Sequence, residues 1–173
     1  MNLNTVFMFY AALLILAGVS GCERNDRYKL EAALESASVS LARQAELSGY
    51  GLITSQELAT LLKRDPSVML VDTRRPSDFG KGHIRSARNF TFPKGVIMDE
   101  GWEDSLMMGH TSEELLQLLG PDRNRLLVFS CSRTRCERGH NAALWAVRLG
   151  YRRVLRHPGG VEAWQGEGFE LVR

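Results

Sequence analysis

The sequence lacks the features of a nucleic-acid-binding protein. Its 173 residues carry 22 basic and 20 acidic side chains, and the formal net charge of +2 is too small to attract a polyanion. No DNA- or RNA-reading motif is present, so no nucleic-acid partner is expected. The sequence also has no internal repeat and no low-complexity segment, and its length leaves no room for two full domains. The composition therefore indicates one ordinary globular domain with a short extension.

Charge is missing altogether from the side chains of residues 1–21, whose centre is apolar from Val6 to Val19. Such a run is typical of a secretory signal peptide. Val19 to Cys22 resembles a bacterial lipobox, in which the signal is cut before the cysteine and Cys22 is lipidated. An uncleaved membrane helix is the alternative, although the run is slightly shorter than the usual ~18 residues. In both cases we expect a protein on the periplasmic side of a bacterial membrane, attached by its N-terminus.

Cysteine is scarce, with three residues in the whole chain. If Cys22 carries lipid, Cys131 and Cys136 are the only thiols of the folded domain. Between Cys22 and that domain, residues 22–50 are polar and alanine-rich, with leucines at loosely helical spacing. We expect this segment to be a partly helical tether that ends at Gly49. The folded domain is then expected to comprise residues 51–173.

Helical and strand patterns alternate from Gly51 onward. Capping boxes at Thr54 and Thr111 each open a predicted helix, and apolar runs at 68–71, 126–129 and 151–155 predict strands. This alternation predicts an α/β fold with a parallel sheet and helices on both faces. In such sheets a ligand binds beyond the carboxyl ends of the strands, where Cys131 is expected.

The segment around Cys131 has the clearest chemistry in the sequence. From Cys131 to Arg156 there are seven arginines and a single acid, Glu137. The arginines nearest Cys131, together with the free N–H groups of the following helix, create positive potential at the thiol. Such surroundings lower a cysteine pKa from about 8.5 to roughly 3.5–7.5, which makes a nucleophilic thiolate. The alternative is that Cys131 is a small buried residue that ends a core strand.

Five motifs in this order resemble the rhodanese-like domain. They are Val71-Asp72-Thr73-Arg74, then Asp78-Phe79, then Gly82-His83-Ile84 with Ala87 and Asn89, then the strand that ends at Cys131, and finally Gly159-Gly160 with Trp164. The resemblance covers residues 51–173 and implies a three-layer domain with a central parallel sheet flanked by helices. It also implies a sulfurtransferase whose Cys131 accepts a sulfane sulfur as a persulfide and passes it to a thiophilic acceptor. The expected partners are a small anionic sulfur donor and a thiol acceptor, and no cofactor or metal is expected.

The loop after Cys131 departs from the common family pattern Cys-x-x-Gly-x-Arg-Ser. Arg138-Gly139 stands in the place of Arg-Ser, so the loop is two residues longer. The spacing Cys131-x4-Cys136 is similar to that in a subset of exported bacterial rhodanese-like proteins with two loop cysteines. The resemblance assigns catalysis to Cys131 and Arg138. The residues expected to bind substrate are Arg133, Thr134, Arg135, Cys136 and Asp72, the last of which either orients the loop or caps a turn.

Other functions are compatible with the same residues. Cys131 and Cys136 can form a reversible disulfide in a thiol-disulfide or sulfur-carrier module without small-molecule turnover. An inactive rhodanese-like binding domain is a further alternative. Phosphatase and arsenate-reductase relatives have a Cys-x5-Arg loop, whereas the arginines here stand at other spacings. The strand-end position favours Cys131 as the nucleophile, and we expect Cys136 to resolve its persulfide or protect it as a disulfide.

Overall fold

The computed structural model describes residues 3–97 and 101–173, with side chains described from residue 25 onward within these ranges. The chain divides into two compact units, Met1–Gln44 and Ala45–Arg173. Helix α1, Leu3–Ser48, forms the described part of the first unit, and its side chains from 25 to 40 are all exposed. The segment expected to be a partly helical tether is therefore helical up to Ser48, and Gly49 follows with a φ of 73°.

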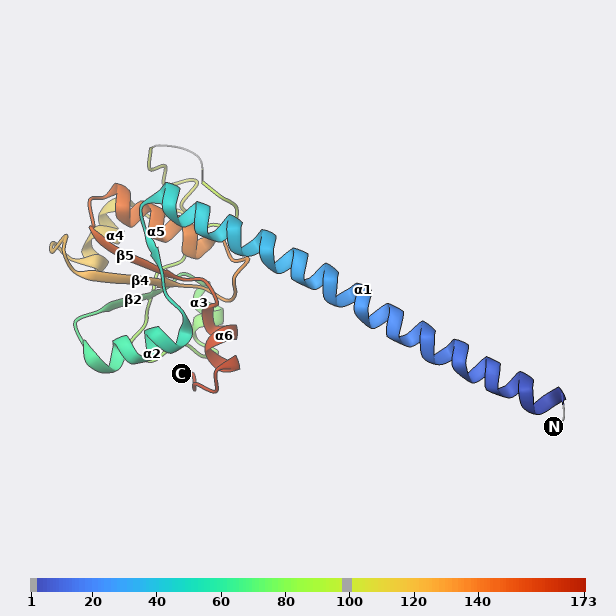
Figure 1. The fold of residues 1–173 in the computed structure, drawn as a ribbon. Helices are drawn as coiled ribbons and strands as arrows, with labels where there is room; N and C mark the ends of the chain where they lie inside the picture. The colour runs from blue at the N-terminus through green and yellow to red at the C-terminus, as the bar shows by residue number, and fades with distance from the viewer. Residues whose placement is uncertain (1–2, 98–100) are drawn as a thin grey trace. The chain divides into compact units, whose positions relative to one another are not determined.

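A parallel sheet forms the centre of the second unit (Figure 1). Its described strands are β1 (Gly51–Leu52), β2 (Met69–Asp72), β3 (Arg88–Asn89), β4 (Leu126–Ser130) and β5 (Arg153–His157), in the spatial order β1-β5-β4-β2-β3. Every pair of neighbouring strands is parallel. The predicted α/β fold with a central parallel sheet is confirmed.

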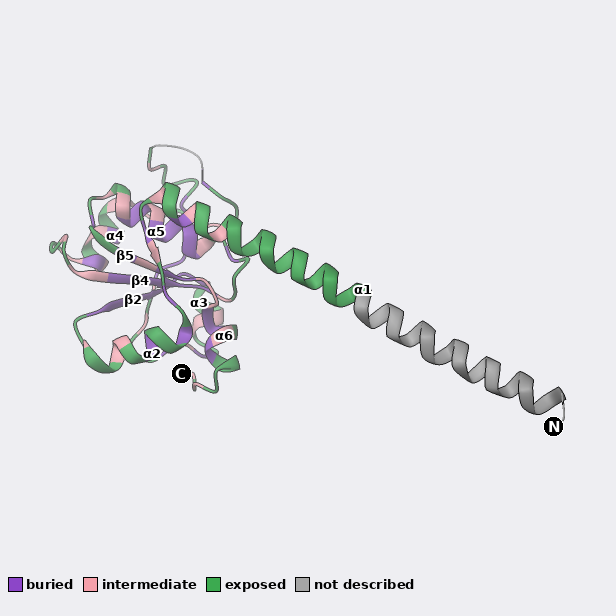
Figure 2. Cartoon of the chain, in the orientation of Figure 1, coloured by how far each residue is buried: buried purple, intermediate pink, exposed green. Residues whose placement is uncertain are grey.

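Helices cover both faces of this sheet, as the buried residues in Figure 2 also indicate. The helices of the second unit are α2 (Ser55–Arg64), α3 (Pro76–Phe79), α4 (Ser112–Leu119), α5 (Arg138–Arg148) and α6 (Gly160–Gly166). Helices α4 and α5 pack against one face through a core cluster that includes Leu127 and Phe129, while α2 and α6 pack against the other through Val128. Successive residues of β4 thus point to opposite faces, which explains why its first four residues are all apolar.

The two predicted capping boxes both form. The Thr54 side chain accepts a hydrogen bond from the Glu57 amide, and the Glu57 side chain accepts one from the Thr54 amide. Thr111 and Glu114 repeat this arrangement at the start of α4. These reciprocal bonds satisfy N–H groups that a helix end otherwise leaves without partners. The helix starts were therefore predictable from four-residue patterns.

The structure differs from the sequence-based expectation at two kinds of boundary. The last strand was expected at 151–155, but β5 runs to His157, because Arg156 and His157 are buried and hydrogen-bonded despite their polarity. The second compact unit also includes residues 45–50, which precede Gly51. Ala45 and Tyr50 are each 5% exposed and belong to the core cluster beneath α5.

Candidate active site

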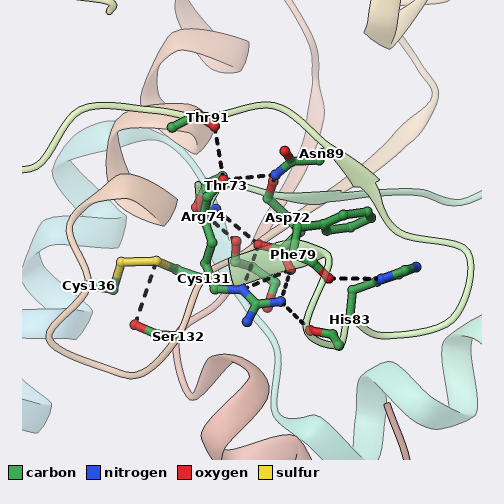
Figure 3. Close-up of polar contacts among 12 residues, drawn as sticks. Asp72, Thr73, Arg74, Phe79, His83, Asn89, Thr91, Cys131, Ser132 and Cys136 are labelled. Atoms are coloured by element: carbon green, nitrogen blue, oxygen red, sulfur yellow. Dashed lines mark hydrogen bonds and ion pairs between the residues drawn. A yellow bond between two sulfur atoms is a disulfide. The ribbon is translucent and has the colours of Figure 1, made fainter. Parts of the chain in front are cut away.

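Cys131 directly follows the last residue of β4, at the carboxyl end of the sheet. Its side chain is 2% exposed and forms a disulfide with Cys136, whose Cα lies 6.2 Å from the Cα of Cys131 (Figure 3). Both cysteines belong to residues 131–137, which we call the cysteine loop and which connect β4 to α5. The expectation that Cys136 can reach Cys131 is confirmed in this structure.

The first part of the cysteine loop is fixed by the N-terminus of α6. The amides of Val161 and Glu162 donate hydrogen bonds to the carbonyls of Cys131 and Ser132, at 3.1 and 3.0 Å. This approach is so close that a Cβ on Gly160 would lie 2.5 Å from the Cys131 carbonyl oxygen. Gly160 also has a φ of 61°, which favours glycine. The glycine pair of the sequence motif therefore brings α6 against the cysteine.

The second part of the cysteine loop is fixed from inside the domain by Arg156, which the sequence analysis did not assign to the site. Arg156 comes from β5 and is 3% exposed. Its guanidinium donates hydrogen bonds to the carbonyls of Thr134 and Cys136, at 3.2 and 3.1 Å. A Cβ on Gly139 would lie 3.7 Å from both the Cys131 Cβ and the Arg156 Nε. A buried positive charge is therefore close to the cysteine pair.

Arg138 is the first residue of α5 and not the last residue of the loop. Its Nε donates a hydrogen bond to the carbonyl of Phe92 at 2.9 Å. Burial, together with the charge of Arg75, lowers the pKa of the Arg138 guanidinium from its ordinary value. A guanidinium still keeps its charge at neutral pH. Arg138 thus supplies a positive charge beside the cysteine loop and joins α5 to the segment after β3.

A positively charged cleft of about 560 Å³ opens beside the cysteine loop, and we call it the basic cleft. Among the described residues, its cationic lining side chains are Arg74, Arg75, Lys81, Lys94, Arg133 and Arg138. Its acidic lining residues are Asp78 and Glu162. The excess of positive charge suits an anionic ligand. Of the residues predicted to bind substrate, Arg133 lies here, and its guanidinium is 3.5 Å from the Glu162 carboxylate.

A smaller hollow of about 200 Å³ lies on the other part of the cysteine loop. Its described lining residues are Lys94, Ser132, Arg133, Arg135, Cys136, Glu137 and Arg138. Cys136 therefore borders this small hollow, whereas Cys131 is not among its described lining residues. Thr134 is exposed at the tip of the loop, and its carbonyl accepts the hydrogen bond from Arg156. The structure thus brings together most of the loop residues that the sequence assigned to the site.

Asp72, like Thr134, lines neither of these two hollows among the described residues. It is 2% exposed, and its carboxylate accepts hydrogen bonds from the Arg74 guanidinium, the shortest at 2.6 Å (Figure 3). The Arg74 amide also donates to this carboxylate, and Asn89 donates to the carbonyls of both Asp72 and Arg74. We call residues 72–75 the Asp72 turn. Its carboxylate orients Arg74 at the cleft wall and does not itself line the cleft, so the turn-forming alternative is the one observed.

Two buried histidines support the site from below. His157 is hydrogen-bonded to the hydroxyls of Ser55 and Ser130, at 2.8 and 3.0 Å, and Ser130 immediately precedes Cys131. His140 is hydrogen-bonded to the Tyr50 hydroxyl at 2.8 Å. Burial lowers the pKa of each histidine to about 4, with a further contribution from Arg156 at His140. Both are therefore neutral at physiological pH.

The predicted signal segment and lipidation site cannot be compared with described side chains. The signal segment and the Cys22 side chain lie outside the residues whose side chains are described. Within the described part of the chain, no helix is both long and apolar enough to cross a membrane. The same part contains no group of three histidine, cysteine or acidic side chains placed to bind a metal ion.

Comparison with known proteins matches the folded unit to characterised sequences. A family model described as "Rhodanese-like domain" matches residues 54–167. The thiosulfate:glutathione sulfurtransferase of Saccharomyces cerevisiae is 28% identical over 109 residues, which are 61% of this chain and 70% of that protein. The residues matched by the family model include β2 to β5, the cysteine loop and α6.

Solved structures with the same fold are more distant in sequence. A Bacillus halodurans protein superposes with a TM-score of 0.56 at 18% identity, covering 78% of this chain and 85% of that one. The homodimeric polysulfide-sulfur transferase of Wolinella succinogenes gives 0.52 at 18% identity, covering 80% and 90%. A human single-domain sulfurtransferase gives 0.50 at 23% identity, covering 69% and 98%. At these identities the likeness shows the fold.

Proposed function

The chain belongs to the rhodanese-like domain family, and from this premise we propose that it is a sulfurtransferase. In the proposed reaction, Cys131 accepts a sulfane sulfur from a small anionic donor and passes it to a thiol acceptor. The observation that carries the proposal is the position of Cys131, directly after β4 and next in the chain to Ser132 and Arg133, which line the basic cleft. The disulfide with Cys136 must first be reduced to free the thiol.

Thiosulfate illustrates the first half of the reaction. The Cys131 thiolate attacks the outer sulfur, the sulfur–sulfur bond of the donor breaks, and sulfite leaves with the electron pair. The thiolate, the transition state and both products are anionic, so fixed positive charge stabilises each of them. Arg156 beneath the cysteine loop and Arg138 at the cleft are the groups to which we assign this role. A general base is unnecessary when the thiolate is already formed.

The second half of the reaction regenerates the thiolate. An acceptor thiolate attacks the outer sulfur of the Cys131 persulfide and carries it away as a new persulfide. The name of the Saccharomyces cerevisiae relative includes both thiosulfate and glutathione, which supports an anionic donor and a low-molecular-weight thiol as acceptor. A cleft of about 560 Å³ has room for a molecule of that class.

Intact-mass spectrometry tests this function. The full chain is reduced, freed of reductant and treated with thiosulfate, and we expect one added sulfur atom that maps to Cys131. The variant Cys131→Ser is the control and should gain no sulfur. The proposal would be overturned if the wild-type protein gained no sulfur atom although its reduced thiols still reacted with an alkylating reagent.

A thiol-disulfide module is the second candidate function, and the Cys131–Cys136 disulfide favours it. In that case the loop exchanges electrons with a partner and does not turn over a sulfur donor. Thiosulfate turnover with a thiol acceptor, measured in reduced wild type and Cys136→Ser, separates the two functions. A sulfurtransferase keeps turnover in Cys136→Ser, whereas a thiol-disulfide module has none in either protein.

We also propose that the protein is held at the periplasmic side of a bacterial membrane by lipid on Cys22. The motif at Val19 to Cys22 and the uncharged segment before it support this location. Cys22→Ser should release the protein from the membrane fraction or leave it as an unprocessed precursor. If the Cys22→Ser variant still incorporates labelled lipid and keeps its mature size, Cys22 is not the lipidated residue. Membrane association without any processing would instead favour the uncleaved helix.

A further inference from the structure

We propose that the cysteine loop also releases sulfide, in a cycle in which Cys136 attacks the Cys131 persulfide and a dithiol reductant restores both thiols. This inference rests on the persulfide of the proposed function. The observation behind it is the bond between the two sulfur atoms, with Cα atoms 6.2 Å apart, inside a single short loop. The sulfur of Cys136 therefore reaches the sulfur of Cys131 that would become the inner atom of a persulfide.

The sulfide-releasing step balances without any further reactant. The Cys136 thiol loses its proton, and its sulfur attacks the inner sulfur of the persulfide. The bond between the inner and outer sulfur breaks, and the outer sulfur leaves as hydrosulfide with the electron pair. One sulfur–sulfur bond forms and one breaks. The two cysteines are oxidised to the observed disulfide, and the sulfane sulfur is reduced to sulfide.

The contacts of the loop favour this geometry before the disulfide forms. Arg156 donates hydrogen bonds to the carbonyls of Thr134 and Cys136, so a buried guanidinium fixes the backbone that carries the second cysteine. The amide of Cys136 donates to the carbonyl of Arg133 at 2.8 Å, which curls the loop back on itself. The reduced loop is therefore held close to the shape in which the two sulfur atoms meet.

In the proposed cycle the reductant is a dithiol that enters the small hollow. Cys136, and not Cys131, is among the described residues that line this hollow, so the first thiolate attacks the Cys136 sulfur. Cys131 then leaves as a thiolate, and nearby positive charge makes it the better leaving group. The second thiol of the reductant displaces Cys136 from the mixed disulfide. The reductant ends as its own disulfide, and both cysteines return to thiols.

A single-turnover experiment without reductant tests the inference. All proteins are full chains that carry Cys22→Ser, so that the loop holds the only thiols. The reduced protein is desalted under anaerobic conditions and mixed with a substoichiometric amount of thiosulfate in the absence of any acceptor. With both loop cysteines, we expect one sulfide released per thiosulfate consumed, together with the loss of two thiols. With Cys136→Ser, we expect the sulfur to stay on Cys131 and no sulfide to be released.

A matched control moves the second thiol within the same loop. Thr134→Cys combined with Cys136→Ser keeps two loop thiols but places one at the exposed tip, and we expect at least a tenfold lower yield of sulfide. Equal yields from the two proteins would overturn the assignment to Cys136. A stable persulfide without sulfide in the protein with both cysteines would overturn the cycle and leave the sulfurtransferase proposal intact. Failure of both proteins to acquire sulfur would overturn the proposed function itself.

Discussion

The Asp72 turn and the cysteine loop follow neighbouring strands, yet they are held in opposite ways. Asp72 is paired with Ser130 in the register of β2 and β4, so both segments leave the same edge of the sheet. Within the Asp72 turn, Arg74 satisfies the Asp72 carboxylate two residues away. The cysteine loop is held by contacts from distant elements, namely α6 and β5, and by its own disulfide.

This difference explains which polar residues remain available for chemistry. A side chain satisfied by a near neighbour, such as Asp72, is used in building the turn. Several side chains of the cysteine loop, among them Arg133 and Arg135, instead line the two hollows, while backbone carbonyls of the loop accept the long-range hydrogen bonds. The local pair thus withdraws the Asp72 carboxylate from the cleft, whereas Arg74, its partner, still lines the cleft.

Breaking the Asp72 turn should have the largest effect on stability. Asp72→Ala leaves the guanidinium of Arg74 buried without its carboxylate, which costs about 3–5 kcal/mol of unfolding free energy. Asp78→Ala is the control, because its ion pair with Lys81 is exposed and is worth about 0–1 kcal/mol. Urea unfolding of both variants measures the difference. Equal losses would show that the Asp72 turn is no more rigid than the surface.

Breaking the support of the cysteine loop should have the next largest effect. Gly160→Ala adds a Cβ beside the Cys131 carbonyl at a positive φ, and we expect a loss of about 2–4 kcal/mol in unfolding free energy. Gly166→Ala in the same helix is the control, because the added methyl group there meets open space. If urea unfolding gives the two variants the same midpoint, α6 does not fix the loop.

Arg138→Ala sharpens the comparison by testing the cleft side of the loop. Losing a charge-assisted contact to the donor should cost about 1.5–3 kcal/mol, which lowers kcat/KM for thiosulfate roughly 10- to 150-fold. Arg152→Ala is the control, because this exposed arginine precedes β5 at the far end of the sheet. If both variants lose kcat/KM to a similar extent, the overall electrostatic field of the protein accounts for the effect and a specific contact of Arg138 does not.

The change that is smallest near neutral pH is a pH dependence of stability through His157. Its pKa is lowered from 6.5 to about 4 in the folded protein, so the unfolded chain binds more protons between these values. The neutral His157 side chain therefore contributes to the unfolding free energy above pH 6.5. This contribution is lost as the pH falls towards 4, with a slope of at most ~1.4 kcal/mol per pH unit. His157→Asn should make this slope shallower in urea unfolding, whereas Gln56→Ala should not. An unchanged slope would contradict the assignment.

Much of the fold was predictable because its signals are local. The capping boxes at Thr54 and Thr111, the apolar β4 and the position of Cys131 after it all depend on residues within a few positions of one another. These features place the cysteine loop at the correct edge of the sheet. The nucleophile candidate was therefore found from the sequence, and the partner cysteine followed from its proximity.

The support of the site was not predictable, because it depends on contacts between distant parts of the chain. Arg156 reaches the cysteine loop only because β5 lies next to β4 in the sheet. Tyr50 was assigned to the tether, yet it bonds to His140 in the core, 90 positions away. The pattern of a basic strand end gives no sign that its arginine is buried, since most arginines are exposed. An arginine of this kind can be assigned to the site only once the pairing register of β4 and β5 is known.

The order of the strands in the sheet also determines when the domain can fold during synthesis. The first strand of the sheet, β1, pairs with the last one, β5, and β4 needs β5 on one side. A chain that has emerged only as far as α5 therefore has an unpaired edge on β4 and no partner for β1. The antiparallel bridge between His83 and Val172 requires nearly the whole chain. Complete pairing of the sheet therefore waits until β5 has emerged, and a chain truncated before β5 exposes the edge of β4.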